Sequence, residues 1–121
     1  MSAHHYVFVH SVRPPGEVIA DIFVACGTAL APGSAGVDYS ALVGSAAVDV
    51  NLAHEYDEDF GIPFPDYESV ITVRDDDRDL ERQEILATRI YHNLAAVGSY
   101  ALALVFDLQH LLRANQGDER T

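Results

Sequence analysis

Many of the residues able to do chemistry are concentrated in the stretch HEYDEDFGIPFPDYE, residues 54–68. It holds six carboxylates and four aromatic rings, and two prolines and a glycine disfavour regular structure around Phe64. Carboxylates attract a basic partner from a distance, and aromatic rings then anchor it with few rotatable bonds. We therefore expect a partner-binding surface formed by Glu55, Tyr56, Asp57, Glu58, Asp59, Phe60, Phe64, Asp66 and Tyr67.

The rings of this loop have two alternative uses. In the first, the loop is exposed, Asp57, Glu58 and Asp59 steer the partner, and Phe60, Phe64 or Tyr67 anchors it. The prolines on either side of Phe64 stiffen its backbone, which lowers the ordering cost on binding. In the second, Phe60, Ile62 and Phe64 fold back as a lid on the core. Both uses can coexist, with two rings inside and two outside.

Catalytic and metal chemistry have less support in the sequence. The six histidines lack the spacing of a local zinc site, although His10 and His54 could meet across neighbouring strands. No nucleophile elbow, phosphate-binding loop or dinucleotide motif is present. Cys26 falls on the apolar face of a predicted helix, where we expect a buried small hydrophobe. We expect no catalytic residue, no metal site and no cofactor.

The charge of the chain is strongly negative and unevenly distributed. Nineteen acidic and seven basic residues give a net charge of −12, and twelve of the acids lie at 55–84 with three arginines. Acidity can serve solubility alone, but uniform solvation does not require acids in one quarter of a chain. A field of this sign repels nucleic acid and anionic membranes, and it attracts basic proteins.

Length and composition predict one soluble domain over residues 1–121, with a single core. No apolar segment approaches the roughly 20 residues that span a bilayer, and the N-terminus has no basic segment or cleavage pattern of a secretory signal. A single cysteine fits a reducing compartment. We expect a cytoplasmic protein.

The periodicity of apolar residues predicts the elements that would position the loop. Strands are expected at 6–13, 47–54, 68–74 and 100–106, and helices at 17–30 and 77–96. Residues 108–115 read as a short terminal helix, 31–37 as a loop, and 38–45 give no assignment. Asp75, Asp76 and Asp77 precede the long helix, where acids interact favourably with the helix dipole, so part of this cluster is structural.

The order of these elements predicts an α+β fold of the ferredoxin-like, split β-α-β type. In that fold a four-stranded sheet, with the last strand central, carries two helices on one face, and here a short C-terminal helix follows. The alternative is another α+β sandwich, in which residues 17–30 form a second hairpin strand.

The stretches HEYDEDFGIPFPDYE, RDDDRDLERQE and YALALVFDLQHLLR resemble small acidic immunity proteins of bacterial polymorphic-toxin and contact-dependent inhibition systems. The resemblance implies a non-enzymatic protein that binds a toxin domain, often a basic nuclease, and blocks its active site with acidic residues. The alternative is a ligand-binding or regulatory domain of ferredoxin-like type, and a small metal- or acid-dependent enzyme comes third. A homodimer is compatible with the sequence.

Overall fold

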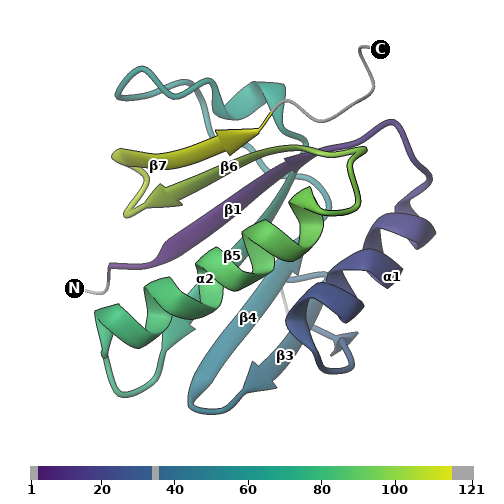
Figure 1. The fold of residues 1–121 in the computed structure, drawn as a ribbon. Coiled ribbons are helices and arrows are strands. Elements are labelled where there is room, and N and C mark those ends of the chain that lie inside the picture. The colour runs from purple at the N-terminus through teal and green to yellow at the C-terminus, as the bar shows by residue number, and fades with distance from the viewer. Residues whose placement is uncertain (1–2, 34–35, 116–121) are drawn as a thin grey trace.

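The computed structural model describes residues 3–33 and 36–115, whose strands form one antiparallel sheet with two helices on one face (Figure 1). The helices are α1 (Pro15–Cys26) and α2 (Leu80–Ala95). The strands follow the order β2-β3-β4-β5-β1-β6-β7 across the sheet. Their bounds are β1 His5–His10, β2 Ala31–Pro32, β3 Tyr39–Val43, β4 Ala46–Asn51, β5 Ser69–Asp75, β6 Ala101–Phe106 and β7 His110–Asn115.

The prediction of a four-stranded ferredoxin-like sheet is wrong, although the α+β class is correct. The sheet has seven strands within the described residues, because β2 and β3 extend it beyond β4, and β7 extends it beyond β6. The four predicted strand segments contain β6 and most of β1, β4 and β5, and both main helices are present. The alternative in which residues 17–30 form a strand is also wrong.

The predicted terminal helix at 108–115 is instead the edge strand β7. Asp107 and Leu108 have φ angles of 56° and 61°, and the Gln109 N–H donates to the Phe106 carbonyl at 3.0 Å. Two consecutive positive φ angles define the tight turn whose twist matches an antiparallel hairpin. The turn therefore returns the chain onto β6, where a bulge between Leu104 and Val105 adjusts the pairing.

The main core lies between the helices and the sheet. Ile22 of α1 and Ile90 and Leu94 of α2 are fully buried against sheet residues such as Val7 and Leu104. Cys26 is buried in the same cluster, as predicted, and burial raises the pKa of its thiol to about 11. Neither helix of the described chain combines the length and the apolar character needed to cross a membrane.

The acids at the start of α2 are held by specific contacts. Asp79 caps the helix by accepting the Arg82 N–H at 3.0 Å. The buried carboxylate of Asp75, at the end of β5, accepts from Arg82 Nε and Nη2 at 2.9 Å each and from Ser45 Oγ at 2.9 Å. The hydrogen bonds from Arg82 hold the pKa of Asp75 well below its usual range. These carboxylates stabilise the β5–α2 connection.

The face of the sheet opposite the helices carries a second apolar cluster. Successive residues of a strand point to opposite faces, so Tyr6 and Phe8 of β1 face away from α1 and α2. The segment between β4 and β5, which contains the 54–68 loop, covers them with Ile62, Phe64 and Tyr67. This loop therefore forms a third layer of the protein.

Candidate functional site

The inner side of the 54–68 loop belongs to the core. Phe64 begins a short 3₁₀ turn, η1 (Phe64–Asp66), and is 2% exposed, with its ring centroid 4.7 Å from that of Phe8. Ile62 and Tyr67 are also buried. The expectation that Phe64 and Tyr67 lie on an exposed surface is wrong, because β1 is apolar on both faces and the second face needs cover. The lid alternative is correct for Ile62 and Phe64.

The outer side of the loop carries Phe60 at the tip of a two-residue turn. Asp59 and Ile62 exchange backbone hydrogen bonds, and Phe60 and Gly61 between them have φ angles of 51° and 74°. The Phe60 side chain is 62% exposed, so the lid prediction is wrong for this ring. A non-glycine residue in the left-handed region costs on the order of 1 kcal/mol, and Asn or Gly tolerates it better.

Most of the predicted carboxylates closely precede this tip in the sequence and form no ion pair among the described residues. Glu55, Asp57, Glu58 and Asp59 are exposed, and none forms an ion pair within the described part of the chain. Asp59 accepts the Phe60 N–H at 2.9 Å, which fixes the turn. Asp66 is exposed on η1. The loop thus presents unpaired acids and two exposed rings, Tyr56 and Phe60, while Phe64 and Tyr67 are buried. The expectation that two rings lie inside and two outside is confirmed.

Tyr56 and His54 connect the outer side of the loop to the inner side. Tyr56 is partly exposed and meets Phe8 edge-to-face, with ring centroids 5.9 Å apart. The Tyr56 N–H donates to His54 Nδ1 at 3.1 Å, so Nε2 carries the proton and donates to the Tyr67 carbonyl. These contacts fix the course of the loop.

The structure gives His10 and His54 separate partners. His10 Nδ1 lies 2.8 Å from Glu68 Oε1, whereas His54 bonds to the loop backbone. Across residues 3–33 and 36–115, no group of three or more His, Cys, Asp and Glu side chains is placed to hold a metal ion.

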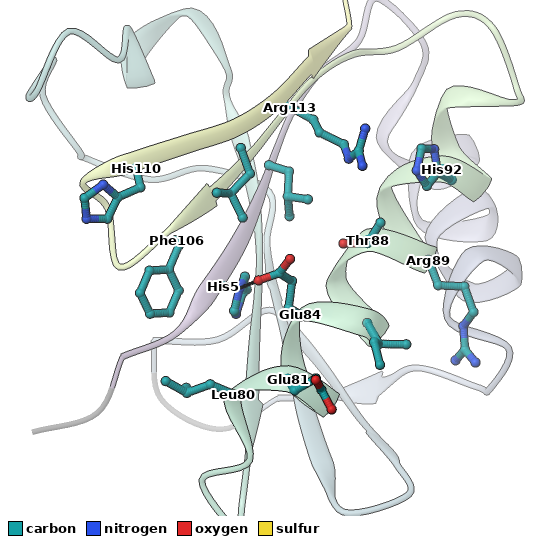
Figure 2. Close-up of a pocket in the computed structure, with 13 residues that line it drawn as sticks. His5, Leu80, Glu81, Glu84, Thr88, Arg89, His92, Phe106, His110 and Arg113 are labelled. Carbon is teal, nitrogen blue, oxygen red and sulfur yellow. Dashed lines mark ion pairs between the residues drawn. The ribbon is translucent and has the colours of Figure 1, made fainter.

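A groove that the sequence analysis did not predict lies between α2 and the β6–β7 hairpin (Figure 2). Its volume is about 1350 Å³, and Leu80, Ile85, Leu104, Phe106 and Leu112 supply its apolar lining. The groove depends on β7 lying beside β6, whereas local periodicity predicts a helix there. Its charged or titratable side chains are His5, Glu81, Glu84, Arg89, His92, His110 and Arg113. Those on α2 follow helical spacing, but the sequence gives no signal that brings them beside β6 and β7.

Comparison of the chain with protein-family models, curated proteins and solved structures found no match.

Proposed function

We propose that this protein is a non-enzymatic binding module whose 54–68 loop docks a basic protein domain. The observation that carries the proposal is the exposed Phe60 in a left-handed backbone conformation, directly preceded in the sequence by exposed carboxylates without ion pairs in the described chain. Stability alone favours a polar residue or glycine at such a tip. A strained, exposed aromatic ring is typical of a residue retained for contact with a partner.

The two sides of the loop have complementary roles in this proposal. Ile62 and Phe64 are buried immediately after the tip and hold the turn in place before a partner arrives. A preorganised loop loses less conformational entropy on binding. The acids then accelerate the encounter with a basic surface, and Phe60 slows dissociation by filling an apolar pocket.

Among basic partners, we favour a toxin domain, with this protein as its cytoplasmic immunity protein. A nuclease needs a cationic surface to hold the phosphate backbone, and a rigid acidic loop can occupy that surface in place of nucleic acid. The resemblance of the loop to those of small acidic immunity proteins supports the same choice.

The first prediction concerns the acids. Asp57→Asn, Glu58→Gln and Asp59→Asn together should slow association about tenfold at low salt and flatten its salt dependence, because exposed charges act mainly on encounter. Binding is measured by surface plasmon resonance against the C-terminal domain of a secreted protein encoded in the adjacent reading frame. The matched control, Asp76→Asn, Asp77→Asn and Glu81→Gln, changes the net charge equally at the start of α2 and should slow association less. Equal effects of the two triple variants would contradict a docking role for the loop.

The second prediction concerns Phe60. Phe60→Asn should speed dissociation about 30-fold, the equivalent of roughly 2 kcal/mol for a hot spot, while the free energy of unfolding stays the same or rises. The same kinetic assay and urea unfolding supply the two measurements. Phe23→Ala, which removes an exposed ring from α1, is the control and should leave dissociation unchanged. If the Phe60 variant dissociates at the wild-type rate, Phe60 is not the anchor. If the wild type does not bind a basic toxin domain, the immunity assignment is refuted.

A further inference from the structure

The sheet extends beyond its helical cover at β7. Helix α2 packs on β1, β5 and β6, which leaves the helix-side face of β7 open beside it (Figure 1). Leu104, Phe106 and Leu112 form the floor of the resulting groove, and Leu80 and Ile85 form its wall on α2. Ile85 is 64% exposed, so this apolar surface lies in water. Water-exposed apolar surface in a groove is typical of a ligand site.

A buried hydrogen-bond donor lines this groove. His5 is 1% exposed, and its orientation is set by Gln83, whose Oε1 accepts the Asp75 N–H at 2.9 Å. The amide nitrogen of Gln83 therefore donates to His5 Nδ1, at 2.7 Å, and the imidazole carries its proton on Nε2. Burial lowers the pKa of His5 and keeps the ring neutral. This tautomer makes Nε2 a donor at the groove.

The Nε2 atom of His5 has no hydrogen-bond partner within the described chain. Glu84 Oε1 lies 3.5 Å from it, too far for a good hydrogen bond (Figure 2). Buried polar atoms without partners are rare in native proteins and call for an explanation such as a ligand. The group that completes His5 must offer a neutral oxygen, because the Glu84 carboxylate beside it repels a negative charge.

The opposite edge of the groove is cationic. Arg13, Arg74 and Arg82 form ion pairs with carboxylates, whereas Arg89 and Arg113, which line the groove, have none within the described residues. Figure 2 shows Arg113 pointing from β7 toward α2, near His92. Glu81 and Glu84 also line the groove, so its formal charges balance overall, but Arg113 has no carboxylate partner at its own end within the described residues.

We propose that the groove binds a small amphipathic carboxylate with a hydroxyl or carbonyl oxygen on its apolar body. The apolar body lies on Phe106, Leu112 and Ile85, the carboxylate pairs with Arg113, and the neutral oxygen accepts the His5 Nε2–H. A hydroxyl can in addition donate to Glu84. An acidic protein fits less well, because the net charge of −12 repels it, whereas a small ligand makes only local contacts.

The groove and the 54–68 loop lie on opposite faces of the sheet, so this proposal is independent of the proposed function. The test uses anilinonaphthalene sulfonate, an apolar anion whose emission rises on binding, and displaces it with 12-hydroxydodecanoate. We expect saturable binding of one dye per folded chain at pH 7, displacement by 12-hydroxydodecanoate, and weaker displacement by dodecanoate, which lacks the hydroxyl. Dodecyltrimethylammonium, which has the same chain length but the opposite charge, should not displace the dye.

Variants locate the site. Arg113→Gln and Leu112→Asn should each weaken dye binding about tenfold, and 12-hydroxydodecanoate should shift the His5 imidazole nitrogen signals in NMR spectra. Arg78→Gln, which removes an unpaired arginine outside the groove, is the matched control and should bind as the wild type does. Circular dichroism establishes that each variant is folded. Unchanged binding by both groove variants, or unshifted His5 signals, would overturn the proposal. So would sedimentation showing a dimer that Leu112→Asn dissociates, because a second copy would then occupy the groove.

Discussion

Asp75 and Asp57 lie in the same acidic quarter of the chain but have opposite surroundings. Asp75 is buried and accepts five hydrogen bonds, two of them from Arg82 seven positions later, whereas Asp57 is exposed without an ion pair in the described residues. The position of the acids before a helix correctly predicted that part of the cluster is structural. Composition cannot make this distinction residue by residue, because it counts both side chains as one negative charge.

A third prediction follows for Asp75. Asp75→Asn should lower the melting temperature by several degrees at pH 7, because Arg82 loses its charged partner. The pKa of Asp75 is lowered in the folded state, so its stabilisation is present above the unfolded pKa of about 4 and is lost as the pH falls below it. The difference in unfolding free energy between wild type and variant should therefore shrink between pH 5 and about pH 3. Urea unfolding at each pH measures it, and a difference that grows on acidification would contradict this account.

Phe60 and Phe64 show what sequence could and could not predict about the candidate site. Both rings stand in the same acidic loop, and the sequence allowed either to face a partner or the core. Gly61 after Phe60 favours a tight turn, which places Phe60 at the tip, but burial of Phe64 depends on the apolar second face of β1. That contact joins residues distant in sequence, so local pattern does not fix it.

At the scale of elements, the 54–68 loop is a layer of the fold as well as a connection. The strand segment HYVFVH is buried on both faces, which requires cover on the side away from the helices. The loop provides that cover with Ile62, Phe64 and Tyr67. Its length thus has a structural cause on its inner side, and only its outer side is left for a partner.

The fourth prediction tests this division of the loop. Phe64→Ala should destabilise the protein by about 3–5 kcal/mol, because the ring is 2% exposed and its removal leaves a cavity against Phe8. Phe60→Ala, the matched control in the same loop, should change the free energy of unfolding by less than about 0.5 kcal/mol. Urea unfolding gives both values. A Phe64 variant as stable as the wild type would show that the loop is not a lid.

Strands β3 and β7 show why the extent of the sheet was not predicted. The segment that forms β3 has mixed polarity and is defined by its pairing with β4 rather than by its own pattern. Leu108, Leu111 and Leu112 have helical spacing, but the turn at Asp107 and Leu108 returns the chain onto β6, so that Leu111 and Leu112 belong to β7. The pair Asp107-Leu108 lacks the glycine of the Asn-Gly and Asp-Gly sequences that usually mark such turns. Tertiary pairing with β6 therefore overrides the local preference.

At the scale of the whole molecule, the seven-stranded sheet separates two surfaces of different character. The loop on one face carries unpaired acids and two exposed rings, Tyr56 and Phe60. The groove on the other face carries apolar residues, two arginines and two glutamates. Because two arginines and two glutamates balance in its lining, the groove carries little of the net charge of −12. The two ligands that we propose would therefore not compete for the same residues.

The fifth prediction concerns the effect of this charge on stability. Self-repulsion among unpaired carboxylates destabilises the compact state. At physiological ionic strength, salt largely screens the repulsion between exposed charges that are more than about 8 Å apart. The free energy of unfolding at pH 7 should therefore rise between about 0.02 and 0.15 M sodium chloride. Asp57→Asn, Glu58→Gln and Asp59→Asn together should raise the low-salt stability, on the order of 0.5 kcal/mol, and reduce its salt dependence.

The triple variant at Asp76, Asp77 and Glu81 separates the loop acids from those near α2. It removes the same charge but loses the Asp77–Arg82 ion pair and favourable interactions with the helix dipole, so it should not gain stability at low salt. Both variants and the wild type are compared by urea unfolding at matched ionic strengths. If stability falls as salt is added, or if both triple variants gain equally, then ion pairs outweigh repulsion. The loop acids would in that case be energetically equivalent to the other surface acids. Their clustering in the loop would then not support binding to a basic partner.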